Sequence, residues 1–310
     1  MKKEIIKFYN EINDINYYIS RSKTIEIKLK YQVLYNKIKK NIIYKIIFYK
    51  FYKYYKNIYK NIDIKNNETI NSYLKEKNSL LNDINGYMLD EEQKRAVYTL
   101  EDNTLLVSGA GAGKSLTIIG KIRYLIEEKN IKEDEILCIS FTNDSCNSLK
   151  DNLNKKYNYN VDVFTFHKLA LNILKNNDEI FSIVSSDYLE YIVDEIFQST
   201  LLYVKSDKKL YYYLKNNILT FIKLFKSNGY TKENFYNFFK ENEKEKNKYI
   251  KKENEILLKI ILNFYIIYHD ELNSSDKIDF DDMIIMAEKS VRENGIYKNY
   301  KYIIIDEYQD

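Results

Sequence analysis

A glycine-rich segment in the first half of the chain contains the residue types that hold a phosphate chain. Phosphates and Mg²⁺ require backbone N–H groups at close range, a helix N-terminus, a lysine and a hydroxyl, and small residues permit the close approach. The segment follows an apolar run and opens a helical pattern. We therefore predict a phosphate-binding loop made of Ser108, Gly109, Ala110, Gly111, Ala112, Gly113, Lys114 and Ser115.

This loop departs from the strict pattern at one position. The pattern has a glycine five residues before Gly113, where this chain has Ser108. Serine is small, so we expect the loop to close. Lys114 is then placed to reach the β- and γ-phosphates, and Ser115 to coordinate Mg²⁺.

A pair of carboxylates follows an apolar run at the other end of the chain. Tyr302–Ile305 precedes Asp306 and Glu307, which lie 192 and 193 residues after Lys114. One acid at the end of a strand can hold Mg²⁺, and the next can activate water for attack on a γ-phosphate. A buried strand that meets an acidic turn is the alternative, and the upstream loop makes it the weaker one.

Short apolar runs alternate with helical periods from residue 86 onward. This alternation predicts an α/β fold with a parallel sheet covered on both faces. The expected strands are Thr104–Ser108, Glu135–Ser140, Val161–Phe164 and Lys301–Ile305, and the expected helices lie near 90–100, 114–128, 143–154 and 166–175. Residues 176–300 contain no convincing strand, so we expect an all-helical insertion there.

The first 85 residues form a basic head. They hold 18 Lys+Arg against 8 Asp+Glu, whereas the remainder holds 31 against 37. The excess indicates contact with a polyanion, or a solvated helical face in a lysine-rich chain. Residues 42–53 predict an amphipathic helix, for which three roles stay open: packing on a partner helix, which we favour, lying on a membrane surface, and touching nucleic acid.

Composition excludes several other classes. The chain has no long uncharged apolar run and no signal-like N-terminus, so we expect neither a membrane span nor secretion. Cys138 and Cys146 are the two cysteines and lack metal-ligand spacing, which is typical of reduced thiols in a cytoplasmic protein. The abundance of Lys, Asn, Ile and Tyr fits an AT-rich coding sequence.

Together with the phosphate-binding loop, five segments taken in order resemble the UvrD/Rep family of superfamily 1 DNA helicases, closest to its helicase IV-like branch. These five are similar to the family's Q motif, its two motifs that touch single-stranded DNA, its acidic segment before the last strand, and its motif II at the acidic strand end. In this chain they are Leu89–Val97, Phe141–Asn143, Thr165–His167, Ile278–Met283 and Asp306–Asp310.

The resemblance implies roles for individual residues. It implies ATP and Mg²⁺ as cofactors, with Gln93 on the adenine, Asp306 on Mg²⁺, Glu307 as the base and Gln309 as the γ-phosphate sensor. The implied DNA contacts are Phe141, Thr142, Asn143, Thr165, Phe166 and His167. Packing at the sheet edge stays an alternative for the two phenylalanines, and a helix-start role for the histidine. Lys121 stands where many relatives carry arginine, which leaves one nucleotide contact open.

The resemblance also implies an organisation. Residues 1–85 are expected as a helical extension, 86–175 and 296–310 as a RecA-like P-loop NTPase domain with an incomplete sheet, and 176–295 as a helical insertion. The chain is expected to be the front part of a 3′–5′ translocase, active on single-stranded DNA and its junctions with duplex, and to hydrolyse ATP poorly by itself. The basic N-terminal helices also offer a surface for a protein partner. The alternatives are an accessory protein of RNA polymerase, which the basic, tyrosine-rich character of these helices argues against, and an inactive remnant.

Overall fold

The computed structural model describes residues 1–13, 18–75, 80–109, 111–177, 181–200 and 208–309. The chain divides into two compact units, residues 1–163 with 300–310, and residues 164–299. Helices α1–α5 therefore belong to the same unit as the phosphate-binding loop. The domain limits given above stay a prediction.

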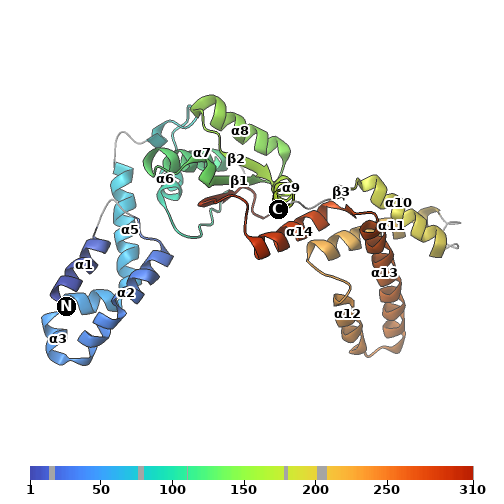
Figure 1. Cartoon of the computed structure of the whole chain (residues 1–310), viewed down its shortest axis with the longest axis horizontal. Helices are drawn as coiled ribbons and strands as arrows, with labels where there is room; N and C mark the ends of the chain where they lie inside the picture. The colour runs from blue at the N-terminus through green and yellow to red at the C-terminus, as the bar shows by residue number, and fades with distance from the viewer. Residues whose placement is uncertain (14–17, 76–79, 110, 178–180, 201–207, 310) are drawn as a thin grey trace. The chain divides into compact units, whose positions relative to one another are not determined.

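The first unit contains a sheet of three strands in the order β2-β1-β5 (Figure 1). β1 and β5 are parallel, and Ile136 is paired with Tyr302 and Ile139 with Ile305. All five residues of β1 are buried, as expected for a central strand. These strands are Ile136–Ser140, Asp162–Thr165 and Tyr302–Ile305, which confirms three predicted strands to within one residue at each end.

Helices precede or follow these strands, which confirms the predicted α/β class. α6 (Glu91–Tyr98), α7 (Lys114–Arg123) and α8 (Asn143–Tyr157) lie where helices were expected. α7 passes into a π-helical turn at Tyr124–Glu128, and a 3₁₀ turn at Glu133–Glu135 precedes β1. Residues from α6, α7, β1 and α8 share one apolar core.

The predicted strand at Thr104–Ser108 is wrong. The segment has no regular secondary structure and no strand pairing among the described residues, and Leu105 and Val107 are 73% and 85% exposed. A run of apolar residues becomes a strand only where a neighbouring strand takes its backbone hydrogen bonds. β1, β2 and β5 pair with one another and leave this segment without such a partner.

The N-terminal extension has its own apolar core. α1 (Lys2–Ile12), α2 (Arg21–Lys40), α4 (Tyr49–Lys56) and the start of α5 (Ile58–Lys75) enclose aromatic and aliphatic side chains. The Phe8 ring lies edge-on to the Phe51 ring, with 5.0 Å between centroids. A 3₁₀ turn at Leu80–Asn82 leads from this extension toward α6.

The helix predicted over residues 42–53 is two helices. The backbone breaks at Phe48, which separates α3 (Ile42–Ile47) from α4. α4 buries Phe51 and Tyr55, so the favoured packing role describes α4 correctly. α3 fully buries none of its residues, and it packs on the same core through the half-buried Tyr44.

The second unit is mostly helical, as expected of an insertion. Two strands that the sequence did not predict, Ser182–Ile183 (β3) and Lys277–Ile278 (β4), pair in parallel. Strands of two residues are too short to show an alternating pattern. The helices are α9 (Phe166–Asn176), α10 (Ser186–Thr200), α11 (Lys208–Ser227), α12 (Asn234–Glu243), α13 (Lys248–Ser274) and α14 (Phe280–Asn294).

Candidate nucleotide-binding site

The phosphate-binding loop has the backbone that its glycines allow. Gly111 and Gly113 have φ of 74° and 80°, in the left-handed region that glycine adopts without strain. Gly113 is the N-cap of α7, and no side chain caps the helix, so the first N–H groups of α7 keep the positive end of the helix dipole available to an anion. Ala110 lies outside the described residues.

Gln93 lies against this loop. Its Nε2 donates to the Ala112 carbonyl at 3.0 Å, and its Oε1 accepts from the Asp90 backbone N–H at 2.9 Å. Asp90 in return accepts from the Gln93 N–H, which completes a capping box at the start of α6. The amide that the resemblance assigns to adenine thus ties α6 to the loop.

Lys114 and the acidic strand end meet beside the loop. The Lys114 Nζ lies 3.0 Å from one carboxylate oxygen of Glu307 and 3.1 Å from the other. Gln309 Nε2 donates to the same carboxylate at 2.6 Å. The hydrogen bond from Gln309, followed by that from Lys114, lowers the pKa of the Glu307 carboxyl below its usual range. Glu307 is therefore ionised at neutral pH.

Asp306 is fixed by the sheet. Its backbone N–H donates to the Ile139 carbonyl at 2.8 Å, which extends the pairing of β5 with β1 by one residue. The next residue, Glu307, has a φ of 53°, unusual for a residue other than glycine. Such strained positions are concentrated at functional sites, where the surroundings hold them in place. Asp310 lies outside the described residues.

This donor set fits a nucleoside triphosphate with Mg²⁺. A helix N-terminus with free N–H groups, one lysine, one exposed hydroxyl at Ser115 and the carboxylate of Asp306 are the groups that such a ligand requires. The Ser108 hydroxyl, at the position of the missing glycine, is buried without a hydrogen-bond partner. It adds a donor to the loop that a glycine would lack.

The first predicted DNA motif follows β1. Phe141 is 58% exposed, so packing at the sheet edge does not account for its side chain. Thr142 is the N-cap of α8, and its hydroxyl oxygen accepts from the Ser145 N–H at 3.1 Å. Asn143 opens the helix and is exposed. An exposed aromatic ring and an amide at a helix start are groups that bases and phosphates use.

The second predicted DNA motif follows β2 in the same way. Thr165 is the N-cap of α9 and accepts from the Lys168 N–H at 3.2 Å. Phe166 is 43% exposed. The His167 ring lies edge-on to the Phe280 ring, with 5.3 Å between centroids, so the histidine is held by the acidic segment predicted before the last strand.

That acidic segment contains a buried charge cluster that the sequence did not reveal. Lys226 is 2% exposed, and its Nζ lies 2.5 Å from Asp279 and 2.6 Å from Asp282. The Tyr268 hydroxyl donates to Asp279 at 2.7 Å. Burial opposes ionisation of Asp279, but the Lys226 ammonium outweighs it, so the pKa of Asp279 lies below its usual range. The spacing of these residues along the chain carries no signal for the contact.

Lys121 makes a structural contact within the chain. Its Nζ donates to the carbonyl oxygens of Val97, at 2.8 Å, and Thr99. These carbonyls lie at the C-terminal end of α6, where a cation is favoured. Lys121 thus joins the helix after the phosphate-binding loop to the helix that contains Gln93.

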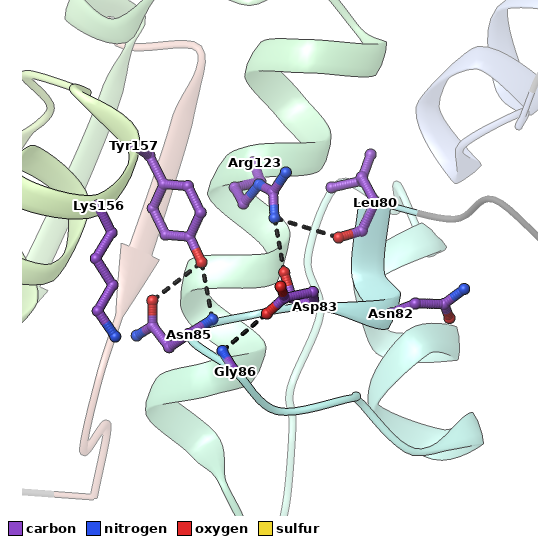
Figure 2. Close-up of a pocket in the computed structure, with 8 residues that line it drawn as sticks. All are labelled: Leu80, Asn82, Asp83, Asn85, Gly86, Arg123, Lys156 and Tyr157. Atoms are coloured by element: carbon purple, nitrogen blue, oxygen red, sulfur yellow. Dashed lines mark hydrogen bonds between the residues drawn. The ribbon is translucent and has the colours of Figure 1, made fainter.

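A separate hollow of about 620 Å³ is lined on one side by residues of the segment 80–86 (Figure 2). Arg123 closes one side, where its guanidinium donates to the Asp83 carbonyl at 2.8 Å and lies 4.6 Å from the centre of the Tyr157 ring. The Tyr157 hydroxyl bonds the backbone and the side chain of Asn85. The hydrogen bonds of these side chains are made within the protein and fix the conformation of this loop. We therefore assign no ligand to the hollow.

The fold and this site define a P-loop nucleotide-binding domain. The family model of the UvrD/REP helicase N-terminal domain matches residues 89–310. The chain therefore belongs to the UvrD/REP helicase family, which confirms the resemblance. None of the described helices combines the length and apolar content that crossing a membrane requires.

Curated relatives are similar to this chain over about three quarters of its length. The ATP-dependent DNA helicase Rep of Buchnera aphidicola subsp. Baizongia pistaciae is 28% identical over 72% of this chain and 32% of its own length. The probable DNA helicase II homolog of Mycoplasma capricolum is 26% identical over 72% and 31%. The ATP-dependent DNA helicase PcrA of Staphylococcus aureus (strain Mu50) is 27% identical over 75% and 30%. The chain spans about a third of the length of these relatives.

Proposed function

We propose that this chain is the ATP-binding part of an ATP-dependent DNA helicase that moves 3′–5′ along single-stranded DNA. The observation that carries the proposal is the meeting of Lys114 with Glu307 beside a glycine loop at the start of α7. Family membership and the names of the relatives support the choice of DNA as the substrate.

Each residue of the site is proposed to have its own role in ATP hydrolysis. Lys114 neutralises the β- and γ-phosphates, and the N–H groups of the loop and of α7 hold them. Ser115 and Asp306 would hold Mg²⁺, which would supply positive charge that stabilises the transition state. Glu307 orients the attacking water and accepts its proton.

Two further residues link this chemistry to the ligand. Gln93 exchanges its bond to the Ala112 carbonyl for the edge of adenine, so that base recognition releases the loop. Gln309, which donates to Glu307, senses the γ-phosphate and its loss. Phe141 and Phe166 offer exposed rings for base stacking, with Thr142, Asn143, Thr165 and His167 as polar neighbours.

Residues 1–310 by themselves are proposed to turn over ATP slowly. An arginine finger that stabilises charge in the transition state is worth about 10³–10⁵ in rate. The site residues proposed above include no such arginine. Hydrolysis at full rate, translocation and unwinding are proposed for a whole protein of the length of its relatives.

The test is nucleotide binding and single-stranded-DNA-stimulated ATP hydrolysis by the whole protein. Lys114→Ala is expected to abolish both, because the phosphates lose their one side-chain cation. Lys150→Ala, an exposed lysine on α8, is the matched control and is expected to leave both unchanged. Hydrolysis that survives Lys114→Ala contradicts the assignment of the site.

An accessory role on RNA polymerase is the second candidate, and the basic, tyrosine-rich character of residues 1–85 argues against it, because a helical hairpin in that role must present carboxylates to a metal site. Binding of the complete protein to single-stranded DNA and to RNA polymerase, measured side by side, separates the two. Polymerase binding without DNA binding would favour the accessory role.

A further inference from the structure

The N-terminal extension has an uninterrupted basic segment. Residues 27–62 contain ten lysines and no aspartate or glutamate. Solvated helix faces normally carry both signs, as the start of α13 does with Lys251, Lys252 and Glu253. A face of one sign repels itself and is usually associated with a partner of the opposite sign.

Four of these lysines form a stripe on the outside of α4 and α5. Phe51, Tyr55, Ile58 and Ile62 are 1–3% exposed and define the buried face of these helices. Residues three or four positions apart are neighbours on a helix, so Lys50, Lys53 and Lys56 follow one another along the outer face of α4, and Lys60 lies on the outer face of α5. The stripe consists of Lys50, Lys53, Lys56 and Lys60, all of them exposed.

The stripe is not used by the fold. Among the described residues of the basic segment, Lys30 alone forms an ion pair, with Glu11. Lys28 lies 4.5 Å from the centre of the Tyr59 ring on α5. The core of the extension is apolar and needs no positive charge. The charge of the stripe therefore remains available to a ligand.

We propose that the lysine stripe is a second nucleic-acid-binding surface, which contacts the phosphate backbone of DNA beside the motor. This inference rests on the proposed function, since DNA is the polyanion on which the motor acts. Phosphate contacts by lysine are independent of sequence, which suits a protein that moves along its substrate. The surface holds DNA near the motor and raises its local concentration.

An anionic membrane is the competing partner, and the positions of the side chains argue against it. Membrane binding needs apolar side chains on the same exposed face as the lysines. Four exposed isoleucines nearby, Ile42, Ile43, Ile46 and Ile47, lie on α3, which holds none of the four stripe lysines. On α4 and α5 themselves Ile58 and Ile62 point into the core, and Ile64, 49% exposed, is the one exposed isoleucine.

The experiment measures how DNA affinity depends on salt. The stripe variant changes Lys50, Lys53, Lys56 and Lys60 to Gln, which keeps helix propensity. The matched control changes Lys244, Lys246, Lys248 and Lys252 to Gln, in a segment of mixed sign, with the same loss of net charge. A fluorescent single strand reports binding by the whole protein, and thermal unfolding checks that each variant is folded.

The stripe variant is expected to lower affinity at least about tenfold at moderate salt. It should also reduce the slope of log K against log salt by up to about 3, since each lost phosphate contact removes about 0.7 on a single strand. The control should match the wild type, and four arginines at the stripe should restore the slope. Equal losses in both variants, or no loss in either, would overturn the proposal.

Anionic vesicles and a nucleotide analogue serve as the two remaining probes. Vesicles of phosphatidylcholine with phosphatidylserine are the membrane probe, and binding to them that depends on the stripe, with unchanged DNA affinity, would overturn the proposal in favour of a membrane. A fluorescent ATP analogue tests the nucleotide site separately. Unchanged DNA binding by the stripe variant, in a protein that binds ATP, refutes the surface and leaves the proposed function intact.

Discussion

The ammonium of Lys114 and the carboxylate of Glu307 lie 3.0 Å apart and neutralise each other, although they are 193 positions apart in the chain. Both side chains are about one-third exposed, so the pair is partly screened by water and easily opened. On the proposed function, a bound γ-phosphate would compete with Glu307 for the same lysine. Displacement of the carboxylate would free it to take a proton from water, so this one ion pair would couple ligand binding to the assembly of the proposed base.

Glu307→Gln is expected to keep ATP binding and to lose hydrolysis. The amide retains the size of the side chain but cannot accept the proton of the attacking water, and general-base catalysis contributes about 10²–10⁴ in rate. Lys114 also loses a competitor, so nucleotide affinity should stay the same or rise. Equilibrium binding of a fluorescent ATP analogue and steady-state hydrolysis give the two values. Glu128→Gln is the control, and loss of nucleotide binding in the Glu307 variant would argue against its role as a base.

Gly113→Ala is expected to abolish nucleotide binding and to cost about 1–3 kcal/mol of stability. Two effects act there. The φ of 80° strains a residue with a side chain, and a Cβ would lie 2.6 Å from Gln93 Nε2. Urea unfolding of Gly113→Ala with and without Gln93→Ala separates them. Shortening Gln93 should relieve the contact but not the backbone strain, and complete recovery in the double variant would contradict the importance of φ.

The strands and helices around the site were predictable where local pattern and tertiary partners agree. β1, with five buried residues in a row, is an apolar run whose neighbours accept its hydrogen bonds. Thr104–Ser108 is equally apolar but lacks such neighbours among the described residues, and no local pattern reveals that difference. The contact of Lys226 with Asp279 could not be predicted either. An ion pair between residues far apart in the sequence produces no periodic pattern, and many other lysines in this chain could have been the partner.

Lys226→Met is expected to destabilise the second unit by about 3–5 kcal/mol, because it leaves the buried carboxylate of Asp279 and the half-buried carboxylate of Asp282 without their cation. A triple variant that also has Asp279→Asn and Asp282→Asn removes the unpaired charges and should recover much of the loss. Thermal unfolding of the three proteins gives the comparison. If Lys226→Met alone were as stable as the wild type, the prediction would be wrong, and water would have to solvate the carboxylates of the cluster in solution.

Stability is expected to rise with pH through Lys121. Burial, and to a lesser extent the nearby Lys129, lowers the pKa of Lys121 from 10.5 to about 7, so above pH 7 the folded chain holds this group neutral. The unfolded chain keeps its proton up to the ordinary value. Between these two values the unfolded state binds more protons, and the free energy of unfolding increases with pH, by at most about 1.4 kcal/mol per pH unit for one group.

Urea midpoints at about pH 7.5 and about pH 9.5 measure this slope. Lys121→Met is the comparison, because it retains the buried chain and has no proton to lose, and its slope should be smaller than that of the wild type. Other titrating groups, Lys129 among them, contribute to both proteins and cancel in the difference. Equal slopes would mean that the carbonyl oxygens of Val97 and Thr99 keep the ammonium charged inside the fold.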